Sequence, residues 1–106
     1  MLKKLIKRIE WELKQAEDYL EQACIVKDDY PNVSELFLTL SRQEIDHAEK
    51  LIKIGDDCIE REHEHEHEHE HEHMSDEFIP VWKWIKRQSE ERINDMYVKK
   101  TRLGGR

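Results

Sequence analysis

The sequence predicts an all-α protein, in which an antiparallel helical hairpin dimerises into a four-helix bundle and a third helix follows. Apolar residues recur at helical spacing in three segments, and only the short stretch KDDYPN separates the first two. The chain has 106 residues, 41% charged and 37% hydrophobic, so its apolar supply is small. We expect three parts: the hairpin over 1–60, a His/Glu-rich tract over 61–74, and a helix with a basic tail over 75–106.

The first helix is predicted from near the start of the chain to about Lys27. Its apolar positions mark one face of an amphipathic helix: Leu2, Leu5, Ile6, Ile9, Leu13, Ala16, Leu20 and Ala23. Glu12 falls among them, whereas Glu10 and Glu17 fall on the solvated side. An unpaired buried carboxylate costs roughly several kcal/mol. Glu12 is therefore a candidate site residue.

The second helix is predicted after Pro31, with Asn32 and Glu35 forming a capping box. Glu44 and His47 interrupt its apolar row at the centre, and a second apolar row widens the buried face. The first row is Val33, Phe37, Leu40, Glu44, His47, Leu51, Ile54 and Cys58, and the second is Ile45, Ala48, Ile52 and Ile59. The short connection makes the two helices antiparallel neighbours.

A hairpin of this size cannot cover its own apolar face, so we expect a homodimer or a higher homo-oligomer. The net charge of −7 argues against nucleic-acid binding, and no apolar stretch reaches the length of a membrane span. Cys24 and Cys58 are far apart and form no Cys-x-x-Cys motif, which indicates reduced core cysteines. A cytoplasmic protein is the expectation.

Two hairpins related by a twofold axis would pool four carboxylates and two imidazoles, as in di-iron and di-manganese helical bundles. Glu44 and His47 are three residues apart and point to one side of the helix, so Glu44 can bridge two ions while His47 and Glu12 bind terminally. This donor set suits iron, or alternatively manganese. Binding needs neutral His47 and ionised acids, so occupancy should fall at low pH. Alternatively, His47 is a satisfied core residue and the buried acid pairs with a lysine.

The stretch from about Ile9 to Ile54 resembles the half-bundle repeat of the rubrerythrin and ferritin-like superfamily. The matching residues are Glu12, Tyr19 seven positions on, Ala23, and ELFLTLSRQEIDHAEKL with Glu44 and His47. A single half that must dimerise is similar to the encapsulated ferritins, which oxidise iron inside a protein shell. The resemblance implies Glu12, Glu44 and His47 as iron ligands and Tyr19 as a hydrogen-bonding partner of a ligand carboxylate. It also implies a shell protein as partner, and hence a place inside a protein compartment.

Residues 62–73 read EHEHEHEHEHEH, a composition that binds metals. In a helix the histidines stack four apart, and in a strand they share one face. The six are His63, His65, His67, His69, His71 and His73. Zinc, nickel or copper should bind there. The tract is a metal collector, a solvated linker with incidental metal affinity, or an engineered affinity insertion.

The third helix is predicted from a cap at Ser75, with Pro80 early enough to be tolerated. Its apolar side is broken and contains Phe78, Trp82, Ile85, Ile93 and Met96. Trp82, Trp84 and Tyr97 are expected to pack against the bundle or a neighbouring dimer, so this helix is a candidate for higher assembly.

These observations favour a di-iron, ferroxidase-type protein that oxidises Fe(II) with oxygen or peroxide, holding two iron ions per dimer. Glu12, Glu44, His47 and Tyr19 are the expected catalytic residues. The alternative is a non-enzymatic buffer or carrier of zinc, nickel, copper or iron, led by the His/Glu tract. A third hypothesis is a structural assembly module without metal chemistry.

Overall fold

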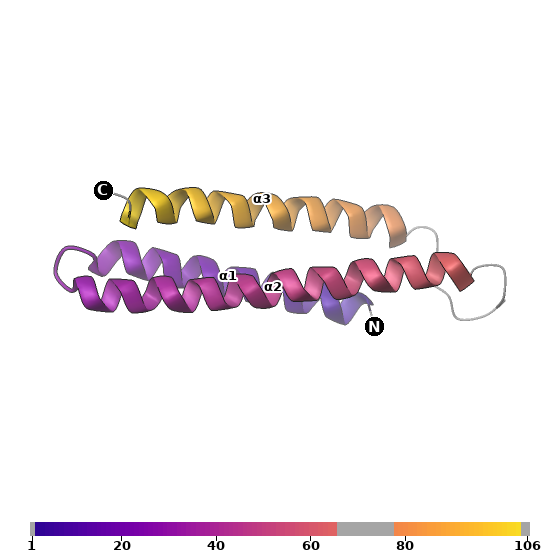
Figure 1. The fold of residues 1–106 in the computed structure, drawn as a ribbon, viewed down its shortest axis with the longest axis horizontal. Coiled ribbons are helices and arrows are strands. Elements are labelled where there is room, and N and C mark those ends of the chain that lie inside the picture. Colours follow the sequence, from indigo (N-terminus) through magenta and orange to yellow (C-terminus); the bar gives the residue numbers. More distant parts are fainter. Residues whose placement is uncertain (1, 66–77, 105–106) are drawn as a thin grey trace.

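The computed structural model describes residues 2–65 and 78–104, which form three helices and no strand (Figure 1). The helices are α1 (Leu2–Val26), α2 (Pro31–His65) and α3 (Phe78–Gly104). The all-α prediction is confirmed. The predicted cap at Ser75 and the tract residues His67, His69, His71 and His73 lie outside the described residues.

The α1–α2 hairpin is held by a seven-residue repeat of small residues. Ser41 Oγ donates a hydrogen bond to the carbonyl oxygen of Ala16 at 2.8 Å, and Ser34 Oγ donates one to that of Ala23 at 2.7 Å. Both serines are buried. Antiparallel helices in this register can approach closely because small side chains recur at the contact. Continued along α2 in steps of seven residues, the repeat passes Ala48 and reaches Gly55, where α3 makes contact.

α2 begins at Pro31, one residue before the predicted cap, so the capping box of Asn32 and Glu35 is wrong. The backbone N–H of Ser34 donates to the Tyr30 carbonyl at 2.9 Å, which makes Tyr30 the residue before the first turn. Proline suits the first helical position because its φ is already helical and it has no N–H to satisfy. At its other end α2 continues through Arg61 to His65, into the start of the His/Glu tract.

The buried face of α2 is the second apolar row, not the row that contains Glu44 and His47. Ile45 and Ala48 are 0% exposed, whereas the His47 side chain is 54% exposed. The prediction that Glu44 and His47 lie at the centre of the buried face is therefore wrong for the single chain. Their row lies at one edge of the α1–α2 contact, and α3 packs against the other edge.

α3 contacts both helices of the hairpin through polar anchors on one side of the pair (Figure 1). Arg92 pairs with Glu10 and Glu17 of α1, both at 2.6 Å, while Trp82 Nε1 donates to Asp56 of α2 at 2.9 Å. Trp82 is 1% exposed and joins the hairpin's core. Among the described helices, none lies on the opposite side of the pair.

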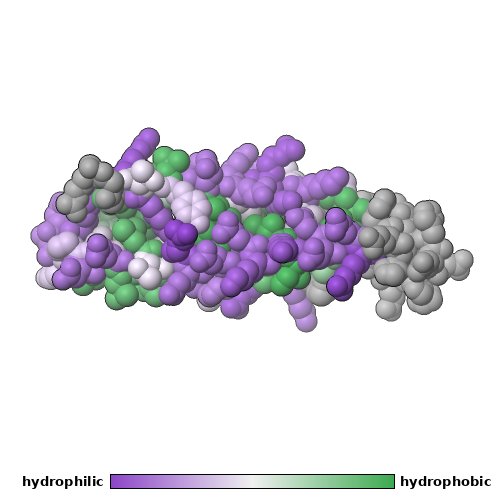
Figure 2. All heavy atoms as spheres, viewed as in Figure 1, coloured by the Kyte–Doolittle hydropathy of each residue, from purple (hydrophilic) through white to green (hydrophobic). Residues whose placement is uncertain are grey.

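Hydrophilic side chains dominate the face of the molecule in Figure 2, with hydrophobic ones in separate spots between them. None of the helices in the described ranges combines the length and apolar content that a bilayer span requires. Cys24 and Cys58 are free and half-buried.

Candidate metal centre

Glu12 of α1 and Glu44 and His47 of α2 come together across the hairpin. One ligand atom from each residue lies within 4.8 Å of the other two. His47 Nδ1 lies 3.4 Å from Glu12 Oε2 and 3.6 Å from Glu44 Oε1. In the described part of the chain this is the one such group of three metal-ligand residues.

The group faces away from α3. Successive residues of a helix are rotated by about 100°, so Glu12 points roughly opposite to Glu10, and His47 roughly opposite to Asp56. Glu10 and Asp56 are bonded to α3. Glu12 and His47 therefore point to the side of the hairpin that α3 leaves uncovered.

Exposure rises across the group from Glu12 to His47. The Glu12 side chain is 3% exposed and that of Glu44 19%, against 54% for His47. Glu12 Oε2 is buried without a hydrogen-bond donor of its own in the described residues. A buried carboxylate oxygen of this kind needs a proton or a cation nearby.

The two carboxylates share their charge unequally. Burial, followed by the neighbouring Glu12 carboxylate, raises the pKa of Glu44 to about 6. Burial also raises the pKa of Glu12, but the hydrogen bond from protonated Glu44 and the charge of Arg8 outweigh it and leave that pKa below its ordinary value. Glu12 therefore takes the negative charge, and Glu44 is the group that can donate a proton to Glu12 Oε2.

The donor chemistry fits a transition-metal ion such as iron or manganese. Two carboxylates supply hard oxygen ligands and an imidazole supplies a borderline nitrogen, without a thiolate. The buried Glu12 oxygen is an acceptor that a cation would satisfy. The predicted three-residue group is thus assembled within one chain and can hold a metal ion.

Tyr19 lies on the same helix as Glu12 but contacts a different residue. Its ring stacks on that of Phe37, with centroids 6.1 Å apart, and within the described residues it makes no hydrogen bond to Glu12 or Glu44. Its role as partner of a ligand carboxylate stays a prediction. His63 and His65 continue the backbone of α2 beyond the group, and metal binding by the tract likewise stays a prediction.

Arg8 is a site residue that sequence reasoning missed. Its Nε donates a hydrogen bond to Glu12 Oε1 at 3.0 Å. The signal was present, because residues four apart on a helix are neighbours and Arg8 precedes Glu12 by four positions.

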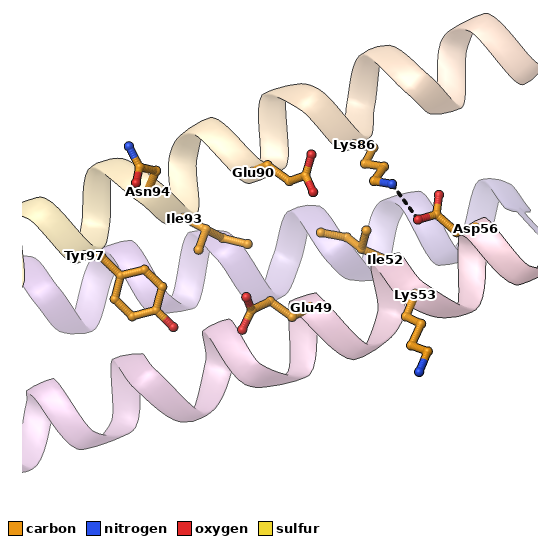
Figure 3. A pocket seen from close by; sticks show the side chains of 9 residues that line it. All are labelled: Glu49, Ile52, Lys53, Asp56, Lys86, Glu90, Ile93, Asn94 and Tyr97. Carbon is orange, nitrogen blue, oxygen red and sulfur yellow. Dashed lines mark hydrogen bonds and ion pairs between the residues drawn. The ribbon is translucent and has the colours of Figure 1, made fainter.

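A separate groove of about 430 Å³ runs between α2 and α3 (Figure 3). Ile52 and Ile93 line it, and the ion pair between Lys86 and Asp56 crosses it at 2.6 Å. Its lining includes none of the three residues of the metal-ligand group.

The family model for rubrerythrin matches residues 3–102, more than twice the stretch on which the sequence resemblance was based. No curated protein and no solved structure shows a significant match to the chain. The matched range includes Glu12, Glu44 and His47, and the fold over it is all-helical. The chain therefore belongs to the rubrerythrin family, within the ferritin-like superfamily.

Proposed function

We propose that this protein oxidises Fe(II) at a centre formed between two copies of the chain. The convergence of Glu12, Glu44 and His47 within 4.8 Å, on the uncovered side of the hairpin, carries the proposal. Proteins of the rubrerythrin family bind iron and often have oxidoreductase activity, which supports the assignment. Fe(II) is the substrate. Two Fe(II) ions each give one electron to dioxygen, which takes up two protons and becomes hydrogen peroxide, or to hydrogen peroxide, which takes up two protons and becomes two water molecules.

The uncovered side also supports a dimer. Apolar side chains project there from α2, in the row that contains the ligands: Val33 is 41% exposed and Ile54 48%. A face of this kind becomes buried when a second copy packs against it. Three ligands per chain then make six per dimer, which is enough for two iron ions.

Each residue has a distinct part in holding the substrate. Glu44 is more exposed than Glu12 and could bridge two ions, whereas His47 is the most exposed of the three and would hold one ion terminally. Glu12 supplies a negative charge that burial keeps away from water. Bound iron supplies the electron, while the protein fixes the ligands and takes up or releases the Glu44 proton.

The test compares Fe(II) oxidation by the wild type, Glu44→Gln and His47→Gln, with Glu49→Gln as an exposed matched control on α2. Both ligand variants should lose oxidation, and Glu49→Gln should retain it. Iron content of the wild type should be two ions per dimer. Retained turnover in the ligand variants would contradict the proposal.

A further variant, with all six tract histidines replaced by glutamine, distinguishes the proposed Fe(II) oxidation from the alternative function as a metal carrier. We expect it to keep Fe(II) oxidation. If it alone loses bound metal while Glu44→Gln and His47→Gln change nothing, the protein is a carrier led by the tract.

A further inference from the structure

Arg8 bonds to the same carboxylate that the metal centre requires. Its Nε–H occupies Glu12 Oε1 at 3.0 Å, and the other oxygen, Oε2, faces His47. Within residues 2–65 and 78–104, Arg8 is the one permanently charged side chain that forms an ion pair with the three ligands. Glu12 thus has one oxygen engaged by a cation of the chain itself.

The exposure of the two partners differs sharply. The Arg8 side chain is 60% exposed, whereas that of Glu12 is 3% exposed. Glu12 cannot leave its position without disturbing the core, but the guanidinium can move into solvent at little cost. The mobile partner of this ion pair is therefore Arg8.

Trp11 offers Arg8 a second contact outside the site. The guanidinium carbon lies 4.7 Å from the centre of the Trp11 ring, and Trp11 is 50% exposed. Stacking of this kind does not need Glu12 and stabilises a guanidinium at the surface. Arg8 can thus release Glu12 while it keeps a partner.

From these contacts we infer that Arg8 is a displaceable counter-ion, which balances the charge of Glu12 without metal and releases this carboxylate when a divalent cation binds it through Oε2. The inference rests on the proposed metal centre. Arginine keeps its proton throughout. When the cation binds, the single positive charge of Arg8 therefore moves into solvent and the two positive charges of the cation take its place beside Glu12. Arg8 is a positioning residue that sets metal affinity by competition.

The experiment uses Zn²⁺, which is diamagnetic, and the full chain with its six tract histidines replaced by glutamine. The Nε–H signal of Arg8, assigned by its loss in Arg8→Gln, is followed by NMR during titration. It should move to the position of a solvent-exposed guanidinium at saturation. Zn²⁺ affinity should increase by about 3- to 10-fold in Arg8→Gln.

Lys4→Gln is the matched control, because it removes an exposed positive charge one turn before Arg8 on the same side of α1. Its affinity should change by less than about twofold, since its charge is screened. Arg8→Lys keeps a competing cation and should stay closer to the wild type than Arg8→Gln does.

The outcomes separate the two proposals. An Arg8 signal that stays unmoved while Zn²⁺ binds in a Glu44-dependent way would overturn this inference alone. Equal effects of Arg8→Gln and Lys4→Gln would also overturn it, because long-range charge would then explain both. Absence of any Glu44-dependent binding would overturn the metal centre and this inference with it.

Discussion

Gly55 of α2 lies directly beneath the indole ring of Trp82 from α3. A Cβ atom built at residue 55 would overlap the ring carbons of Trp82. The ring is 1% exposed, and its Nε1 donates to Asp56, the next residue of α2. The absence of a side chain at one position of α2 thus makes room for the largest side chain of the core, and α3 is anchored there.

Gly55→Ala should destabilise the protein by about 1–3 kcal/mol, the range for overpacking a core. The gain in helix propensity, about 1 kcal/mol, offsets only part of this cost. Urea unfolding followed by circular dichroism measures the difference. Asp57→Ala, an exposed neighbour on α2, should change stability by less than about 0.5 kcal/mol. A variant at 55 as stable as the wild type would show that Trp82 does not rest on Gly55.

The helical repeat was sufficient to predict the hairpin and the grouping of Glu12, Glu44 and His47, because these three residues break an otherwise apolar periodicity. It could not show which edge of the hairpin stays open. Both apolar rows of α2 have the same period and similar composition. Only the docking of α3, through long-range contacts such as Trp82 with Asp56, decides between them.

Periodicity gives no information on ion pairs between segments far apart in the chain. The contacts of Arg92 with Glu10 and Glu17 depend on how α3 is placed against α1. The sequence predicted neither of these two ion pairs. Arg8 is a local contact and was within reach of a helical wheel. It was missed because an arginine on a solvated edge is ordinary.

Asp56→Asn should destabilise the protein at neutral pH by about 0.5 kcal/mol, since the pair with Lys86 is partly exposed and screened. Burial raises the pKa of Asp56, but hydrogen bonds from Lys86 and Trp82 outweigh it and lower the pKa below 3.8. The stability that ionised Asp56 contributes is therefore fully present above pH 3.8, and it is lost as pH falls through the folded-state pKa. Unfolding at neutral and acidic pH measures it.

Asp56→Ala is the companion variant, because it also removes the acceptor for Trp82 Nε1. Loss of this acceptor should lower the free energy of unfolding by about 1–3 kcal/mol, and this loss should persist in acid. If Asp56→Asn and Asp56→Ala lose the same stability at every pH, the hydrogen bond from Trp82 contributes nothing beyond the charge.

Glu44→Gln should stabilise the metal-free protein above pH 6. The folded-state pKa of Glu44, about 6, lies above its ordinary value of 4.5, so its ionisation opposes folding. The favourable contribution of the proton is complete below pH 4.5 and is lost as pH rises through 6. The amide mimics the protonated acid, so the gain is about 1–2 kcal/mol at pH 7.5 and vanishes in acid.

Urea unfolding in the presence of a chelator measures this difference, with the exposed Glu49→Gln as control. The control should change stability by less than about 0.5 kcal/mol. A Glu44→Gln protein less stable than the wild type at pH 7.5 would contradict the account of shared charge between Glu12 and Glu44. If Glu44→Gln stabilises the metal-free protein and also loses metal binding, Glu44 serves to bind a cation at a cost in stability.

Ile54→Glu should dissociate the proposed dimer, because residue 54 lies in the ligand row on the side that α3 leaves uncovered. Val98→Glu is the matched control: Val98 is 45% exposed and Ile54 48%, but Val98 lies on α3. Burying the new charge at residue 54 should weaken self-association by about 10-fold or more. Sedimentation equilibrium over a concentration series measures the change, and circular dichroism verifies that both variants remain helical. If Val98→Glu dissociates the dimer and Ile54→Glu does not, the copies meet through α3, and each set of three ligands remains within its own chain.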